Sequence, residues 1–233
     1  MQNTQRDAFG YEMDVFQTPS GKNITFHAIK HGSIRVEFDN LEFEIDPVIN
    51  LNDKKTDYQA FPDADYILVT HEHFDHLDPE AIQALEKQNT EIITNAACAE
   101  KLGRGTVMVN GDKRVLRENI HLEAVPAYNT TPGREKYHPR GRDNGFILTI
   151  DGFRIYIAGD TEDIPEMEGI KNIDVAFLPC NQPFTMTPAQ LVHATSMIQP
   201  KVVFPYHYGD TSMDELKSLL TNTPSELRIR QYQ

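Results

Sequence analysis

The segment Thr70-His71-Glu72-His73-Phe74-Asp75-His76-Leu77-Asp78-Pro79 directly follows the apolar run Tyr66-Ile67-Leu68-Val69. Three imidazoles and the Asp75 carboxylate fall within six consecutive positions of this segment. Neutral imidazole nitrogen and carboxylate oxygen are the ligands that borderline divalent cations take. So dense a set of them after a buried-type strand predicts a metal-binding loop rather than a polar turn that is rich in histidine.

The spacing within the segment indicates how the ligands divide. The end of a strand can direct His71 and His73 to one side, while Asp75 and His76 reach over from the turn that follows. One loop would then contribute to two adjacent metal pockets.

A helix is expected directly after this loop. Asp78 is a residue type that caps helix N-termini, and Pro79 suits the first helical position. Ala81, Ile82 and Leu85 form an apolar stripe with helical spacing. The ligands are therefore predicted to be held between a strand and a helix.

Composition and charge limit the class of protein. The chain has 233 residues, 39% of them hydrophobic, without a Gly/Ser/Pro-rich linker, which predicts one domain over residues 1–233 with a loosely ordered start at 1–13. The formal charge of −13 argues against a broad nucleic-acid-binding surface. Two cysteines, Cys98 and Cys180, are too few for a disulfide framework, and no apolar segment reaches the length of a membrane span. We therefore expect a cytoplasmic protein without nucleic-acid or membrane partners, whose oligomeric state stays open.

Short apolar runs alternate with turn signals along the rest of the chain, which predicts an α/β (α+β) protein with helices outside its sheets. Asp46 follows the third of these runs, where it either supports the metal loop or forms a simple turn. Expected strands cover residues 24–27, 34–38, 41–45, 91–94, 106–109, 120–125, 144–150, 153–158, 173–178 and 226–230, and expected helices cover 96–102, a segment beginning at Thr187-Pro188, and 212–220.

A second carboxylate signal lies at Gly159-Asp160-Thr161, after the strand expected at 153–158. A carboxylate at a strand end, beside a glycine that allows close approach, is suited to bridge two cations about one water molecule apart. Asp160 is therefore a candidate bridging ligand, and a helix N-cap is the alternative role for it. Glu162, Asp163 and Glu166 are interpreted as capping or surface residues.

A third strand end carries His207, which follows the apolar run Val202-Val203-Phe204-Pro205-Tyr206. Since two other strand ends already carry ligands, His207 is predicted to be the last ligand of the second pocket. His193 lies off the apolar stripe of its helix and is expected to be exposed or to pack. His27 and His31 are interpreted as strand or turn residues.

The pattern His71-x-His73-x-Asp75-His76, then Gly159-Asp160-Thr161, then His207, resembles the metallo-β-lactamase-fold superfamily along essentially the whole chain. Residues 144–208 are similar to the branch of ascorbate-6-phosphate lactonase-like and uncharacterised metal-dependent hydrolases. The resemblance implies a four-layer αββα sandwich with the metals at one edge of the two sheets. It also implies that His71 and His73 hold one metal, that Asp75, His76 and His207 hold the other, and that Asp160 bridges them.

One position departs from this family pattern. Ala124-Val125-Pro126-Ala127-Tyr128-Asn129 ends a strand where the family usually has another metal-binding histidine. Asn129 is a weaker candidate ligand through its amide oxygen, His138 is a candidate from the next loop, and an incomplete first pocket is the third alternative. That loop carries four cations between Arg134 and Arg142, which are either a clamp for a phosphate or carboxylate or a solvated surface.

Together these residues predict a metal-dependent hydrolase with two divalent metals, zinc or manganese. Its metal-activated hydroxide would attack an ester, lactone or phosphodiester bond of an anionic small molecule. Asp75 is placed to orient the nucleophile, and His138 or Tyr208 to protonate the leaving group. The alternatives are a mononuclear-iron oxidoreductase like the persulfide dioxygenases, which keep the same ligand types, and a non-catalytic metal-binding module; flavodiiron relatives have Glu where this chain has His73.

Overall fold

The computed structural model describes residues 4–221 and 223–232. The chain divides into two compact units: the first runs through Met108 and includes the last described residues, and the second spans Val109–Arg230. Each unit is built on one large β-sheet against which α-helices pack, and four α-helices occur among the described residues. The predicted α/β class is therefore confirmed, whereas a single domain over residues 1–233 stays a prediction.

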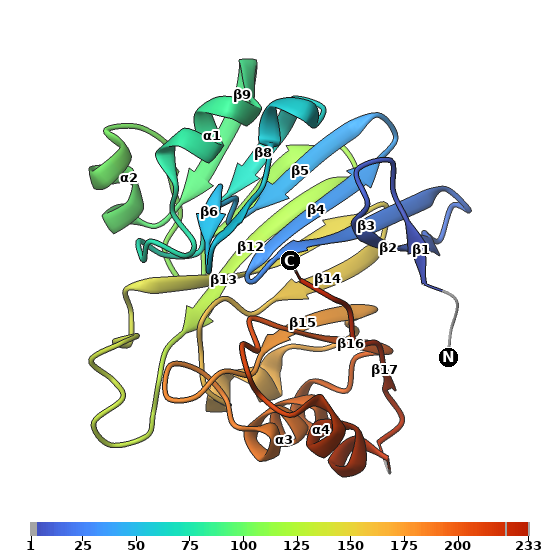
Figure 1. Cartoon of the computed structure of the whole chain (residues 1–233), viewed down its shortest axis with the longest axis vertical. Helices are drawn as coiled ribbons and strands as arrows, with labels where there is room; N and C mark the ends of the chain where they lie inside the picture. The colour runs from blue at the N-terminus through green and yellow to red at the C-terminus, as the bar shows by residue number, and fades with distance from the viewer. Residues whose placement is uncertain (1–3, 222, 233) are drawn as a thin grey trace. The chain divides into compact units, whose positions relative to one another are not determined.

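The first unit contains an eight-stranded sheet in the order β1-β2-β3-β4-β5-β8-β9-β10 (blue to green in Figure 1). Strands β1 to β5 pair antiparallel in succession, whereas β5, β8, β9 and β10 are parallel neighbours. Their bounds are β1 Gln5–Arg6, β2 Glu12–Gln17, β3 Asn23–Lys30, β4 Ser33–Phe38, β5 Leu41–Ile45, β8 Ala64–Leu68, β9 Glu86–Thr94 and β10 Thr106–Val107; β6 Asn50–Leu51 and β7 Lys54–Lys55 form a separate ribbon, and a 3-10 turn spans Tyr58–Ala60.

Register in this sheet positions the metal loop. Ile45 at the end of β5 pairs with Leu68 at the end of β8, and both strands run in the same direction. Parallel strands that end together bring the residues beyond them to one edge of the sheet. Asp46 and Thr70 therefore lie side by side at this edge, with the histidine segment directly after them.

The two helices of the first unit follow the sequence signals closely. Helix α1 spans Pro79–Leu85, and the Asp78 carboxylate accepts from the backbone N–H groups of Glu80 and Ala81 as its N-cap. Its apolar stripe packs into a core that includes Ile67 and Ile92 of the sheet. Helix α2 spans Ala96–Leu102, capped by Asn95 and ended by Gly103 with a φ of +67°.

The second unit contains a seven-stranded sheet in the order β11-β12-β13-β14-β15-β16-β17. Strands β11 to β14 pair antiparallel and β14 to β17 parallel. The β13–β14 hairpin turns at Asp151-Gly152, with φ of +49° and +79°, as two-residue hairpins favour. The bounds are β11 Lys113–Arg117, β12 Ile120–Ala127, β13 Asp143–Ile150, β14 Phe153–Ile157, β15 Val175–Pro179, β16 Val202–Tyr206 and β17 Glu226–Leu227, with a 3-10 turn at Pro165–Gly169.

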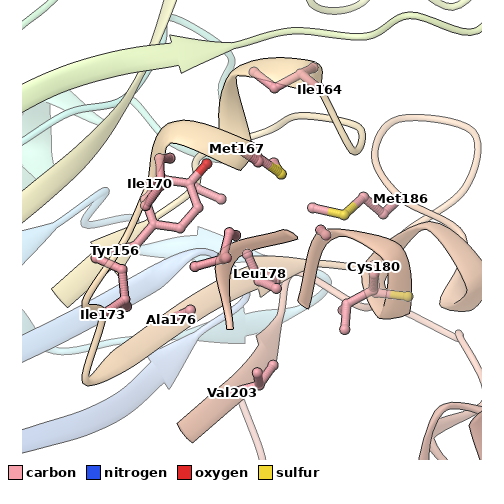
Figure 2. Close-up of a cluster of buried hydrophobic side chains, with 14 of the residues drawn as sticks. Tyr156, Ile164, Met167, Ile170, Ile173, Ala176, Leu178, Cys180, Met186 and Val203 are labelled. Carbon is pink, nitrogen blue, oxygen red and sulfur yellow. The ribbon is translucent and has the colours of Figure 1, made fainter. Parts of the chain in front are cut away.

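Helices α3, Pro188–Ile198, and α4, Met213–Leu220, pack on one face of this sheet. Thr187 and Gln190 form a reciprocal capping box at the start of α3. Figure 2 shows the core under these helices, where strand residues Tyr156, Ala176, Leu178 and Val203 meet side chains of the 164–173 segment. Cys180 belongs to this core, and Cys98 is buried in the first unit, so both cysteines are packing residues without a disulfide.

The start of the chain differs from its prediction. Residues 1–3 lie outside the described part, but residues 4–13 are ordered by the sheet: β1 pairs with β2, which in turn pairs with β3 along its whole length. Tyr11 is buried, and the rings of Phe9 and Tyr11 pack against Phe61 with 4.9 and 5.6 Å between ring centroids. The expectation of a loosely ordered start is therefore wrong there, because long-range pairing orders a segment without an apolar pattern of its own.

No α-helix in the described part of the chain is long and apolar enough to cross a membrane.

Candidate metal centre

The first unit holds one set of predicted ligands, His71, His73, Asp75 and His76, in the loop between β8 and α1. His71 and His76 are fully buried, and their ring centroids lie 4.1 Å apart. His71 Nε2 lies 3.1 Å from His73 Nδ1. At this distance one ring nitrogen donates a hydrogen bond to the other in the absence of a cation, and both nitrogens would face a cation bound between them. The geometry within this loop fits imidazole ligation.

Asp46 holds the loop from behind. Its carboxylate accepts from Thr70 N at 2.8 Å and from Thr70 Oγ1 at 2.7 Å, and one oxygen lies 2.8 Å from His76 Nδ1. A carboxylate on one ring nitrogen fixes the tautomer and directs the other nitrogen to a metal. Of the two interpretations of Asp46, the structure supports the one in which it orients the metal loop.

His31, which we interpreted as a strand or turn residue, lies at this loop. Its Nε2 is 3.2 Å from Asp75 Oδ2, and the ligand atoms of His31, Asp75 and His76 lie within 4.8 Å of one another. The backbone of His31 has a φ of +46°, a region that few residues other than glycine adopt. No local sequence signal indicates this, because the contact joins positions 44 residues apart.

Gly32 makes a close approach to the same loop. A Cβ added at Gly32 would lie 2.7 Å from His76 Cε1 and 3.1 Å from His76 Nδ1. Real Cβ atoms essentially never show contacts under 3.0 Å. The turn between β3 and β4 therefore depends on glycine here if His76 is to keep its position on Asp46.

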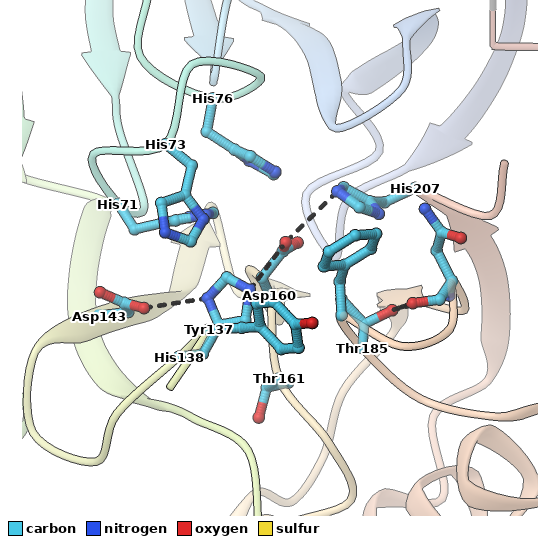
Figure 3. A network of polar contacts seen from close by, with 12 residues as sticks. His71, His73, His76, Tyr137, His138, Asp143, Asp160, Thr161, Thr185 and His207 are labelled. Atoms are coloured by element: carbon cyan, nitrogen blue, oxygen red, sulfur yellow. Dashed lines mark hydrogen bonds and ion pairs between the residues drawn. The ribbon is translucent and has the colours of Figure 1, made fainter. Parts of the chain in front are cut away.

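The second unit holds the other predicted ligands, and Figure 3 shows three of them converging. Asp160 Oδ2 lies 3.3 Å from His138 Nε2 and 3.3 Å from His207 Nε2. Each of these side chains is at least 97% buried. One carboxylate oxygen between two imidazole nitrogens is the arrangement expected of a bridging ligand. Asp160 and His207 were both predicted from strand ends, and within this unit the structure brings them together.

His138 is oriented by a second carboxylate. Its Nδ1 lies 3.1 Å from Asp143 Oδ2, and Asp143 is in turn held by Arg142 Nε at 2.6 Å. The ring thus has a carboxylate on each nitrogen, Asp143 on one side and Asp160 on the other (Figure 3). A histidine held by a carboxylate at one nitrogen, with the other nitrogen facing a ligand set, has the orientation of a metal ligand.

Asn129 occupies a supporting position. Its backbone N–H donates to His138 O at 2.9 Å, and its side-chain amide donates to Phe184 O at 2.7 Å and Arg134 O at 3.3 Å. Its Oδ1 is buried and accepts no hydrogen bond among the described residues. The amide therefore fastens the loop of His138, and a ligand role for Asn129 stays a prediction.

Glu162 differs from its interpretation as a capping or surface residue. Its side chain is fully buried, and Oε2 accepts from Thr130 N at 2.8 Å, Thr131 N at 2.6 Å and Thr130 Oγ1 at 3.1 Å. Burial alone would raise its pKa, but these hydrogen bonds outweigh it and hold the pKa below the usual 4.5. The sequence did not indicate this role because the partners lie 31 and 32 residues away.

The remaining candidates lie outside the ligand sets. Tyr208 donates its hydroxyl to Arg230 O at 2.7 Å. His193 is exposed, as expected, and its Nδ1 lies 2.7 Å from Asp163. Glu166 accepts from the Tyr128 hydroxyl and from Arg140, both at 2.7 Å.

Comparison with known proteins defines the class. The family profile described as the β-lactamase superfamily domain matches residues 23–207, so the chain belongs to the metallo-β-lactamase superfamily. A UPF0173 metal-dependent hydrolase of Caldivirga maquilingensis is 33% identical over 188 residues, covering 77% of this chain and 79% of that protein. One from Archaeoglobus fulgidus is 32% identical over 174 residues, covering 71% and 75%.

Solved structures agree with this assignment. A crystal structure of a protein from Parabacteroides distasonis, provisionally described as a metal-dependent hydrolase, is 56% identical, with a TM-score of 0.92, and covers 96% of this chain and 100% of that one. The metallo hydrolase Igni18 of Ignicoccus hospitalis is 25% identical, with a TM-score of 0.76, and covers 89% and 94%. The predicted family and fold are confirmed, and the chain is a metal-dependent hydrolase of this superfamily.

Proposed function

We propose that this enzyme hydrolyses an ester, lactone or phosphodiester bond of a small anionic molecule. Two divalent ions, zinc or manganese, would be held by His71, His73, Asp75, His76, Asp160 and His207. The observation that carries the proposal is the position of Asp160, one oxygen of which lies 3.3 Å from both His138 and His207.

The chemistry of the donors fits such ions. Each unit carries buried imidazoles that approach a carboxylate or another imidazole, and in each a carboxylate orients a ligand from behind: Asp46 for His76 and Asp143 for His138. Burying so many polar groups is costly unless they are paired or coordinate a metal. Imidazole together with carboxylate, without a thiolate, suits zinc and manganese.

We assign His138 as the ligand that completes the first site. Both of its ring nitrogens face carboxylates, so it has no nitrogen directed at a leaving group. This favours ligation over the proton donation that we also considered for His138. The first site would then consist of His71, His73 and His138, and Asn129 would hold the loop.

The mechanism follows from these positions. A bound divalent ion lowers the pKa of water to about 7 and so supplies hydroxide at neutral pH. Asp75, with its carboxylate held by His31 at 3.2 Å, would orient the nucleophile through its other oxygen. Asp160 would hold both sites at a fixed spacing. This spacing would keep the attacking group aligned with the bond that is broken.

The test is the metal content of protein purified without added metal, measured for wild type, His138→Ala, Asn129→Ala and the exposed control His121→Ala. We expect two zinc or manganese ions per chain in wild type and in His121→Ala, about one in His138→Ala, and close to two in Asn129→Ala. A full complement in His138→Ala with a loss in Asn129→Ala would reverse the ligand assignment.

Activity assays on the same protein preparations distinguish hydrolysis from the alternative functions. We expect turnover of at least one ester, lactone or phosphodiester of a panel, and at least 100-fold less with Asp75→Ala. One iron per chain with oxygen uptake would instead indicate an oxidoreductase, and no turnover above Asp75→Ala would indicate a binding module.

A further inference from the structure

The loop of residues 133–142 offers fewer free cations than its sequence implies. Arg142 pairs with Asp143 at 2.6 Å and donates to Tyr137 O, Arg140 pairs with Glu166 at 2.7 Å, and Arg134 lies 3.6 Å from Glu162. Internal carboxylates already occupy all three arginines. The arginine clamp that we considered for this loop therefore has little support in the structure.

Lys136 is different. It is exposed, and it has no carboxylate partner among the described residues. Its Nζ lies 4.9 Å from the ring centroid of Tyr137, within the range of a cation–π contact. The loop thus presents the Lys136 ammonium beside the face of Tyr137.

Tyr137 belongs to an aromatic pair. Its ring meets Phe184 edge to face, with 5.1 Å between centroids and 73° between planes. Phe184 remains 40% exposed although it is a large apolar side chain. Its backbone is fixed, because Phe184 N donates to Asn181 O at 3.0 Å and Phe184 O accepts from Asn129 at 2.7 Å. A rigid backbone that holds an aromatic ring in solvent is typical of a contact surface.

This pair adjoins the ligands of the second unit. Tyr137 directly precedes His138, the histidine whose Nε2 lies 3.3 Å from Asp160 Oδ2, and Figure 3 shows Tyr137 and His138 together. On the other side, the Asn181 side chain packs against Gly209, two residues beyond His207; a Cβ at Gly209 would lie 3.2 Å from Asn181 Oδ1. The loop that carries Phe184 therefore spans from the segment of His138 to the segment of His207.

We infer that the substrate has a planar apolar portion, which packs against Tyr137 and Phe184, and an anionic group, which pairs with Lys136. This inference rests on the proposed function, because it places the reacting bond at the ligands beside this surface. The substrate would then be an anionic ester with an aryl group or another planar group.

The test compares four esters: monophenyl succinate, phenyl acetate, monoethyl succinate and ethyl acetate, which combine the presence or absence of a ring and of a charge. Acid release is followed for wild type, Phe184→Ala, Lys136→Met and two controls. Phe9→Ala is the matched aromatic control, with 39% exposure in the first unit, and Lys113→Gln is the matched lysine control.

We expect Phe184→Ala to lower kcat/KM for both phenyl esters by about 3- to 10-fold, with little change for the ethyl esters. Lys136→Met should lower it for both succinates by about 2- to 5-fold, an effect that added salt removes. The two controls should match wild type. Equal losses on all four esters would overturn the inference, because they would indicate a structural role.

A binding measurement separates the inference from the reaction. Two carboxylate anions, phenylacetate (the anion of phenylacetic acid, not the ester phenyl acetate) and acetate, are titrated calorimetrically into the metal-loaded protein and its variants. Wild type could hydrolyse none of the esters and still bind phenylacetate more tightly than acetate, with both Phe184→Ala and Lys136→Met weakening the binding of phenylacetate. That result would contradict the proposed reaction and support the substrate-binding surface. If phenylacetate binds no better than acetate, or if Phe184→Ala changes only the oligomeric state, the inference is overturned.

Discussion

Three residues around the ligand sets share an unusual backbone. His31, Asp46 and His207 have φ of +46°, +46° and +47°, although none is glycine. Such conformations cost about 1–3 kcal/mol each and persist where surrounding contacts enforce them, often at functional sites. Each of the three follows the end of a strand, at β3, β5 and β16. Each left-handed residue thus lies directly beyond an apolar strand and carries a polar side chain, which is buried for Asp46 and His207.

Substitution of Gly32 tests whether the turn between β3 and β4 positions His76. In Gly32→Ala the new methyl group would meet His76 Cε1 at 2.7 Å, and His76 cannot move away without losing Asp46 at 2.8 Å. We expect the free energy of unfolding to fall by about 1–3 kcal/mol, as for overpacked core sites. We also expect weaker metal binding, because His76 would be displaced. Urea denaturation and metal titration measure the two effects.

Gly169→Ala is the matched control, because a Cβ there would meet nothing within 4 Å and its φ is not left-handed. Its stability and metal affinity should stay close to those of wild type. If Gly32→Ala also matched wild type in both measurements, the turn between β3 and β4 would have no role in positioning His76.

At the scale of elements, the sequence predicted most of what local chemistry determines. Helix α1 begins after Asp78, α2 ends at Gly103, and the β13–β14 hairpin turns at Asp151-Gly152, each through a cap or turn residue. Long-range pairing was not predicted, as β2 and β11 show. Lys113–Arg117 is a charged edge strand, and such strands lack the alternation that marks a half-buried one.

The same distinction holds for the site. Asp160 and His207 were predicted because each follows an apolar strand, and that signal is local. The contact of His31 with Asp75 and the hydrogen bonds to Glu162 join residues distant in sequence, so no local pattern marks them. The arginines of the 133–142 loop suggested anion binding. Two of them pair instead with carboxylates of the chain itself, Glu162 and Glu166, which belong to a different segment and could not be recognised as partners from the loop sequence.

Glu162 connects two elements, and its effect should depend on pH. It fixes the turn after β12 by accepting from Thr130 and Thr131, and its folded-state pKa lies below the usual 4.5. A carboxylate with a depressed pKa contributes stability that is present above its unfolded pKa and is lost as pH falls through the folded pKa. We expect Glu162→Gln to lower the free energy of unfolding by about 1–3 kcal/mol at pH 7, and by less as pH falls below about 4.5. Denaturant melts over this pH range measure the difference.

Glu168→Gln is the control for charge alone, because Glu168 is exposed on the neighbouring 3-10 turn. Its unfolding free energy should follow that of wild type at every pH. A constant difference between Glu162→Gln and wild type from pH 7 to acid pH would contradict the depressed pKa.

For the whole molecule, the proposal ties stability to metal. The proposed ligands, at residues 71–76, 138, 160 and 207, are distant in sequence, so bound ions would stabilise only the folded chain. Binding to the folded state at 100 times the dissociation constant adds about 2.7 kcal/mol. For a chain of this length that corresponds to a rise in Tm of about 5–10 °C. We therefore expect a chelator to abolish activity and to lower Tm by this amount, with both restored by added zinc or manganese.

Two variants show whether such a shift comes from the proposed ligands. Asp160→Asn keeps the shape of the side chain but removes the negative charge of the carboxylate that approaches both His138 and His207. It should therefore lose most of the metal-dependent rise in Tm, measured by calorimetry with and without chelator. His193→Ala, whose partner Asp163 lies outside both ligand sets, should keep the full rise. An equal rise in wild type and in Asp160→Asn would mean that the stabilising ion binds elsewhere, because neutralising a carboxylate that bridged two ions would weaken the binding of both.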